Sequence, residues 1–197
     1  MTYEIFSALL LFTLVSSATP GPNNLMLMTS GANYGFKRTL PHLLGVNLGF
    51  MFMVVLVGLG LTKLFDAYPV IYNILKVVSV AYLLYLAFKI ATSDPTMASN
   101  KGESKPMSFI QAVIFQWVNP KAWTMALMAI SVYAPSNNVE AVLFVTMVFG
   151  MVNLPCITVW TILGKNIRRF LTNSKRLRVF NCLMASMLVV SLYPMFL

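Results

Sequence analysis

The chain has 197 residues, of which 58% are hydrophobic and only 10% are charged. Soluble domains carry about 25% charged residues, and a soluble fold of this length could not hide so much apolar surface from water. A bilayer accepts such a chain because lipid is the solvent for its outward side chains. The composition therefore predicts an integral membrane protein and excludes an ordinary soluble domain.

The net charge of +9 would also fit a nucleic-acid-binding protein. However, eleven of the 14 basic residues lie between hydrophobic stretches, where such charge typically fixes membrane orientation. No segment alternates basic and aromatic residues on a solvated surface. We therefore expect membrane lipids as partners and no nucleic acid.

Six stretches are long and apolar enough to cross a bilayer. The first could be read as a cleaved signal peptide, but its only charge is Glu4 and its apolar run continues to Met28. We expect an all-α polytopic membrane protein with one domain, residues 1–197, and six transmembrane helices. The six windows are Ile5–Met28, Leu40–Leu61, Val70–Ile90, Phe109–Val132, Val139–Leu163 and Val179–Leu197.

The connectors differ in charge. The first, third and fifth carry the eleven basic residues when Lys89, at the end of the third window, is counted with the third connector. They include Lys37 and Arg38 in the first and the run from Lys165 to Arg178 in the fifth. Basic connectors usually stay in the cytoplasm. The pattern predicts a multi-pass protein whose termini both face the periplasm.

The first window contains Thr19, Pro20, Gly21, Pro22, Asn23 and Asn24 in succession. Each proline lacks an N–H and clashes with the carbonyl four residues back, so a regular helix cannot continue. A kink packed against neighbouring helices would need only one proline. We interpret this segment as a helix break whose freed carbonyls need donors.

The fourth window contains a second break at Asn119, Pro120 and Lys121. A lysine near the bilayer centre is costly unless it faces protein or water, although snorkelling to an interface is an alternative. We expect Lys121 to be functional or to act as a structural counter-charge.

The two breaks open corresponding halves of the chain, residues 1–92 and 108–197, joined by a cytoplasmic loop at 93–107. With three spans in each half, this spacing predicts a 3+3 inverted repeat, and interrupted helices at corresponding places point to a substrate site at the midplane. Asn47 and Asn153 in the second and fifth windows correspond loosely. These two amides and Gln116 could either join helices or line the path. Gly45-x-x-x-Gly49 favours close helix packing within the monomer, and a homodimer stays open.

The helix ends suggest the ligand. A helix that restarts after Pro22 presents free N–H groups and a positive dipole end to a carboxylate, and Lys121 adds a charge. The ends of the preceding half-helices offer carbonyls to an ammonium group. The breaks therefore favour a zwitterion such as an amino acid.

These motifs, with Gly35-Phe36 after the first break and Ala122 after the second, resemble the LysE/RhtB family of amino-acid exporters over the whole chain. Leu48-Gly49-Phe50, Lys89–Ser93, Lys105-Pro106 and Ser108-Phe109 are similar to its cysteine/O-acetylserine branch. The resemblance implies proton-driven efflux of small amino acids or derivatives, cysteine/O-acetylserine-like or threonine/homoserine-like, across the bacterial inner membrane. It also implies that residues 20–24 and 119–121 line or shape the path.

Proton-coupled transporters commonly use a buried carboxylate or histidine. All five acidic residues lie at span ends or in connectors, which leaves His42 and Lys121 as candidates. One histidine with Cys156 and Cys182 gives no metal cluster. We expect no metal, no cofactor and no enzymatic activity. The alternatives are an exporter of another small solute or cation, or an intramembrane redox or enzyme protein.

Overall fold

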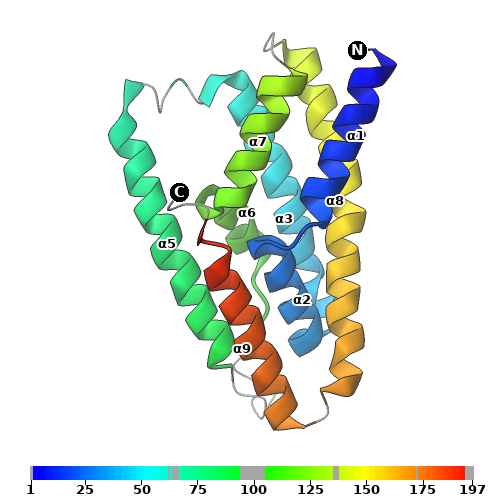
Figure 1. Cartoon of the computed structure of the whole chain (residues 1–197), viewed down its shortest axis with the longest axis vertical. Coiled ribbons are helices and arrows are strands. Elements are labelled where there is room, and N and C mark those ends of the chain that lie inside the picture. Colours follow the sequence, from blue (N-terminus) through cyan, green and yellow to red (C-terminus); the bar gives the residue numbers. More distant parts are fainter. Residues whose placement is uncertain are drawn as a thin grey trace.

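The computed structural model describes residues 2–61, 63, 67–93, 105–134, 138–171 and 173–193. All regular elements in this part of the chain are helices (Figure 1). They are α1 (Tyr3–Ala18), α2 (Pro22–Tyr34), α3 (Phe36–Leu56), η1 (Val57–Leu61), α5 (Pro69–Ala91), α6 (Phe109–Val118), α7 (Pro120–Tyr133), α8 (Val139–Ile167), η2 (Arg168–Phe170) and α9 (Ser174–Val190).

The helices fit a membrane protein. Three stretches are single helices long and apolar enough to cross a bilayer: Phe36–Leu61, Asn73–Ala91 and Val139–Phe170. The pair α1 and α2, bent by 51°, makes a fourth if it forms one span. The all-helical membrane architecture is therefore confirmed. The count of six spans and the inverted repeat stay predictions.

Several helices extend beyond the apolar windows. α8 continues to Ile167, past the expected end at Leu163, and carries Lys165 in its last turn. α9 begins at Ser174 rather than Val179, because the Asn173 side chain accepts a hydrogen bond from the Lys175 N–H and caps the helix. The end of the sixth window, residues 194–197, and the loop residues 94–104 lie outside the described part of the chain.

The helix α8 packs against α1, α2 and α3. Its crossing with α2 is tight: a Cβ at Gly31 would press on the Thr161 carbonyl oxygen, and one at Gly164 on that of Met28. Glycine lets the two backbones approach this closely.

A second close crossing joins α3 to α6. A Cβ at Gly45 would press on the Phe109 carbonyl oxygen, and one at Gly49 would lie 2.7 Å from Val113 Cα. The Gly45-x-x-x-Gly49 motif therefore packs two helices of the same chain, as expected.

The described buried hydrophobic residues form three clusters, of which two are large. One joins α1, α3, α7 and α8 around Met53 and Phe149, and the other joins α2, α5, α6 and α9 around Leu83 and Phe115. At each helix break, after α1 and after α6, the chain passes from a helix of one large cluster to a helix of the other. The polar break residues are thus held between two hydrophobic cores.

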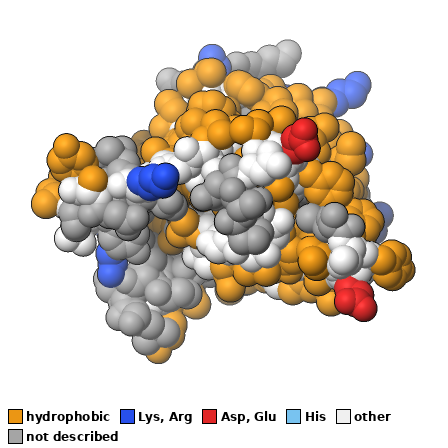
Figure 2. Space-filling view, turned by 90° about the horizontal axis from the view of Figure 1, so that it is seen from above, with side chains coloured by type: hydrophobic (Ala, Val, Ile, Leu, Met, Phe, Trp, Pro, Cys, Tyr) orange, Lys and Arg blue, Asp and Glu red, His pale blue; other side chains and the backbone are white. Residues whose placement is uncertain are grey.

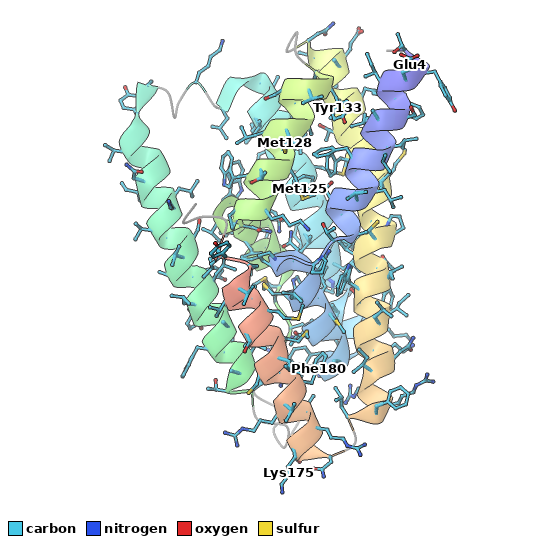
Figure 3. All side chains as sticks on the ribbon, in the orientation of Figure 1. Glu4, Met125, Met128, Tyr133, Lys175 and Phe180 are labelled. Atoms are coloured by element: carbon cyan, nitrogen blue, oxygen red, sulfur yellow. The ribbon has the colours of Figure 1, made fainter. Side chains whose placement is uncertain are left out.

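The described parts of the basic connectors lie together at one end of the molecule. The α2–α3 junction, the end of α5 and the α8–α9 connection share the lower end in Figure 1, opposite the start of α1. Figure 3 places Glu4 and Lys175 at these opposite ends. The upper end, seen in Figure 2, shows acidic and basic side chains among hydrophobic ones.

We expect Gly164→Val to lower the free energy of unfolding by about 3 kcal/mol, the upper range for overpacking, because the new side chain meets backbone rather than a mobile group. Unfolding in mixed micelles titrated with a denaturing detergent measures this. Val159→Ile, at a 55% exposed position of the same helix, is the control. Equal stability of both variants would contradict the close α2–α8 crossing.

Candidate functional site

The first break separates α1 from α2. Thr19 and Gly21 are extended, with φ/ψ of −67/146° and −174/175°, and α2 begins at Pro22. Because the helix stops at Ala18, its last carbonyls lose their usual backbone donors. In a bilayer no water replaces those donors, so the protein itself must supply them.

Side chains from three other parts of the fold supply these donors. The Asn24 amide donates to the carbonyl oxygens of Ser17 and Thr19, both at 2.8 Å. The Trp160 indole N–H donates to the Ala18 carbonyl at 3.1 Å.

The Lys121 ammonium completes the set. It donates to the Thr19 carbonyl at 2.7 Å, to Thr19 Oγ1 at 2.8 Å and to the Pro20 carbonyl at 3.3 Å. Thr19 Oγ1 in turn donates to the Ser16 carbonyl at 3.1 Å. Every carbonyl from Ser16 to Pro20 therefore accepts a side-chain hydrogen bond.

The second break places Lys121 at the start of α7. Asn119 is extended (φ −93°, ψ 108°), is 1% exposed and accepts from the Lys121 backbone N–H at 3.2 Å, which caps the helix. Pro120 occupies the first turn, where its missing N–H costs nothing. Gly21 leaves room for the lysine, since a Cβ there would lie 2.6 Å from Lys121 Cδ.

Paired amides hold the two breaks together. Asn23 donates to the Gln116 side-chain oxygen at 2.8 Å, and Gln116 donates back to Asn23 at 3.2 Å. A second pair joins α8 to α3, where Asn153 donates to Asn47 Oδ1 at 2.9 Å. These amides join helices, and Asn23 and Asn153 also face a cavity.

This central cavity lies between the breaks and has a volume of about 20 Å³. That volume has room for a single water molecule. It is lined by Ser16, Ser17, Gly21, Asn23, Asn24, Asn119, Lys121, Ala122, Met125 and Asn153. The Ser17 hydroxyl is buried here with no hydrogen-bond partner among the described residues.

Two larger cavities lie on either side of the breaks. The outer cavity, about 680 Å³, reaches Thr19–Pro22, Lys76 and Lys121 and extends along α7 to Met128; Figure 3 shows Met125 and Met128 above the breaks. The inner cavity, about 470 Å³, lies between α2, α3 and α5 toward the basic end and contains His42.

The structure brings together most of the residues that the sequence singled out. Thr19, Pro20, Gly21, Pro22, Asn23, Asn24, Gln116, Asn119, Pro120, Lys121 and Asn153 meet at the breaks or line the two adjoining cavities. Asn47 is joined to this group by the hydrogen bond that it accepts from Asn153. His42 lies apart, in the inner cavity.

Sequence reasoning missed Ser16, Ser17 and Trp160. The two serines immediately precede the first break, and that position was the signal available. Trp160 lies on α8, far from either break in sequence, so no local pattern could have indicated its bond to Ala18.

Comparison with known proteins gives consistent matches. The sequence profile for LysE type translocators matches residues 14–192. The cysteine/O-acetylserine efflux protein of Salmonella paratyphi A is 35% identical over 133 residues, which are 68% of this chain and 67% of that protein. Its namesake in Escherichia coli K12 is 34% identical with the same coverage. No solved structure gives a significant match.

We expect Asn23→Leu and Gln116→Met together to destabilise the protein less than the sum of the single changes, with a coupling of about 1 kcal/mol, because each single change takes hydrogen bonds away from the amide that remains. A double-mutant cycle on the free energy of unfolding measures the coupling. In the control cycle, Ser7→Ala on an exposed turn of α1 replaces Gln116→Met. We expect no coupling energy between Asn23→Leu and Ser7→Ala. Additive effects at Asn23 and Gln116 would contradict the pairing.

Proposed function

The chain belongs to the family of LysE type translocators, and we propose that it exports small α-amino acids or derivatives of the cysteine and O-acetylserine kind. The proposed membrane is the bacterial inner membrane, with the basic end of the molecule in the cytoplasm. The relatives that carry an efflux name are transporters rather than enzymes. Threonine or homoserine is the second candidate substrate.

The observation that carries this proposal is the cluster of acceptors around the Lys121 ammonium where the two breaks meet. The Thr19 and Pro20 carbonyls and Thr19 Oγ1 form a cage that already holds one ammonium group, that of Lys121. An amino acid brings an ammonium and a carboxylate on one carbon. Both groups find complementary partners where Lys121 meets the end of α1.

Charge in the cavities supports a carboxylate ligand with an uncharged side chain. The outer cavity carries Lys76 and Lys121, and the inner one carries Lys89 and Lys105. Among the described residues that line the three cavities, none is an aspartate or glutamate. A cationic side chain such as that of lysine would meet only like charge.

The bonding of Lys121 suggests how the substrate enters the break. An ammonium has three N–H donors, and all three are engaged with Thr19 and Pro20. Lys121 therefore has no donor left for a carboxylate until it leaves this cage. We propose an exchange in which the substrate ammonium takes the carbonyls and the freed Lys121 pairs with the substrate carboxylate.

The central cavity must widen during this exchange, because about 20 Å³ cannot hold an amino acid. The outer and inner cavities flank it on opposite sides of the breaks. Alternating access would open the break toward one of them at a time.

In a bacterial strain that lacks its own amino-acid exporters, we expect expression of the chain to raise efflux of cysteine and O-acetylserine but not of lysine. Lys121→Met should lower that efflux at least about tenfold, equivalent to about 1.4 kcal/mol, because the substrate carboxylate loses its cation. Labelled amino acids released from preloaded cells provide the measurement.

Lys63→Met, at an exposed position near the outer end, is the control for loss of a lysine, and membrane content of each variant is measured alongside. Efflux of threonine and homoserine alone would make the second candidate substrate the correct one. No change for any amino acid would overturn the proposal.

We propose that the proton gradient drives export, as the family resemblance implies, with His42 and Lys121 as the candidate carriers. A protonophore should then abolish uphill accumulation of substrate in inverted membrane vesicles, whereas collapse of a sodium gradient should not. Accumulation that survives the protonophore would exclude proton coupling.

A further inference from the structure

The inner cavity is a second place where a small molecule fits. Its volume of about 470 Å³ falls in the usual range for ligand sites of about 300–1,000 Å³. Its walls come from α2, α3, α5 and residues 105–111. Unlike the central cavity, it needs no rearrangement to admit an amino acid.

His42 forms the buried polar part of this cavity. The side chain is 1% exposed, and neither ring nitrogen has a hydrogen-bond partner among the described residues. Buried polar groups without partners are rare in folded proteins. A neutral imidazole offers one acceptor and one donor, and here both belong to a residue that lines an accessible cavity.

Two cations line the exposed part of the cavity. Lys89 near the end of α5 and Lys105 before α6 line it with exposed side chains. No acidic residue is among its described lining residues. The half-buried Tyr82 contributes an aromatic wall. The cavity thus combines a positive opening with a buried, uncharged acceptor.

We propose that the inner cavity is a loading site for the exported amino acid, distinct from the site at the breaks. Lys89 and Lys105 attract the substrate carboxylate, and a ring nitrogen of His42 accepts a hydrogen bond from the substrate ammonium. This inference rests on the proposed export function and adds to it a first selection step. Cationic amino acids are rejected here, before they reach the breaks.

The position of the loading site suits delivery to the breaks. Met26 and Thr29 on α2 line the inner cavity, and Asn23 and Asn24 on the same helix line the central one. Asn23 and Met26 are three residues apart, which is about 4.5 Å along a helix axis. A ligand in the inner cavity therefore lies next to the central site.

The test is equilibrium binding of radiolabelled S-methyl-L-cysteine, a redox-stable probe, to the purified full chain in lipid nanodiscs. We expect His42→Leu to weaken binding about tenfold, whereas His42→Gln, which keeps a donor and an acceptor, should retain most of the affinity. Binding should persist in Lys121→Met, which impairs only the site at the breaks. His42→Leu in that background should then weaken the remaining binding about tenfold or more.

The charge of the opening is tested in the same assay. Lys89→Glu with Lys105→Glu should weaken binding of the probe and raise the potency of L-lysine as a competitor at least about tenfold. Lys175→Glu with Arg178→Glu makes the same change of charge at exposed positions of α9, and Figure 3 places Lys175 at the same end of the molecule. This control should leave both values unchanged.

The outcomes separate the two proposals. Binding by the wild type that is insensitive to His42→Leu and to the paired lysine changes would overturn the loading site and leave the export function standing. Loss of binding in Lys121→Met alone, with no residual His42-dependent binding, would likewise assign the ligand to the breaks only. A wild type that binds no amino acid would overturn both.

Discussion

The structure depends on one constraint, which is that a helix interrupted inside a membrane must find donors for its own freed carbonyls. α1 ends in mid-bundle, and the five carbonyls from Ser16 to Pro20 all face this requirement. The donors come from α2, α7 and α8 through Asn24, Lys121 and Trp160. Those three helices must therefore converge on the end of α1. Two of them, α2 and α8, also cross each other closely at Gly31 and Gly164.

The sequence predicted where the helices break but not how the breaks are satisfied. Pro20, Pro22 and Pro120 favour a break, because a proline lacks the N–H and clashes with the carbonyl four residues back. Proline alone does not decide this, since Pro41 and Pro155 lie inside continuous helices. Which side chain serves which carbonyl depends on the packing of distant helices, and so the role of Trp160 could not be found in advance. Lys121 was expected to offer a free positive charge, whereas in the structure its three donors are already engaged.

The positions where the helices begin and end also follow only in part from the local sequence. Apolar windows end where charged residues begin, but the helices continue through them: α8 includes Lys165, and α9 begins with Lys175 in its first turn. His42 was chosen from the sequence only as a titratable residue. Its burial without a described partner, beside a cavity, is a tertiary property that no pattern in α3 reveals.

The bond between Lys121 and Thr19 spans 102 residues of chain, and the bond between Trp160 and Ala18 spans 142. During synthesis the end of α1 is therefore made long before two of its three partners exist. Until α7 and α8 have been inserted, the exposed carbonyls of the first break must be satisfied by water or by the insertion machinery. The first helix pair of this protein can reach its final place in the bilayer only after most of the chain has been translated.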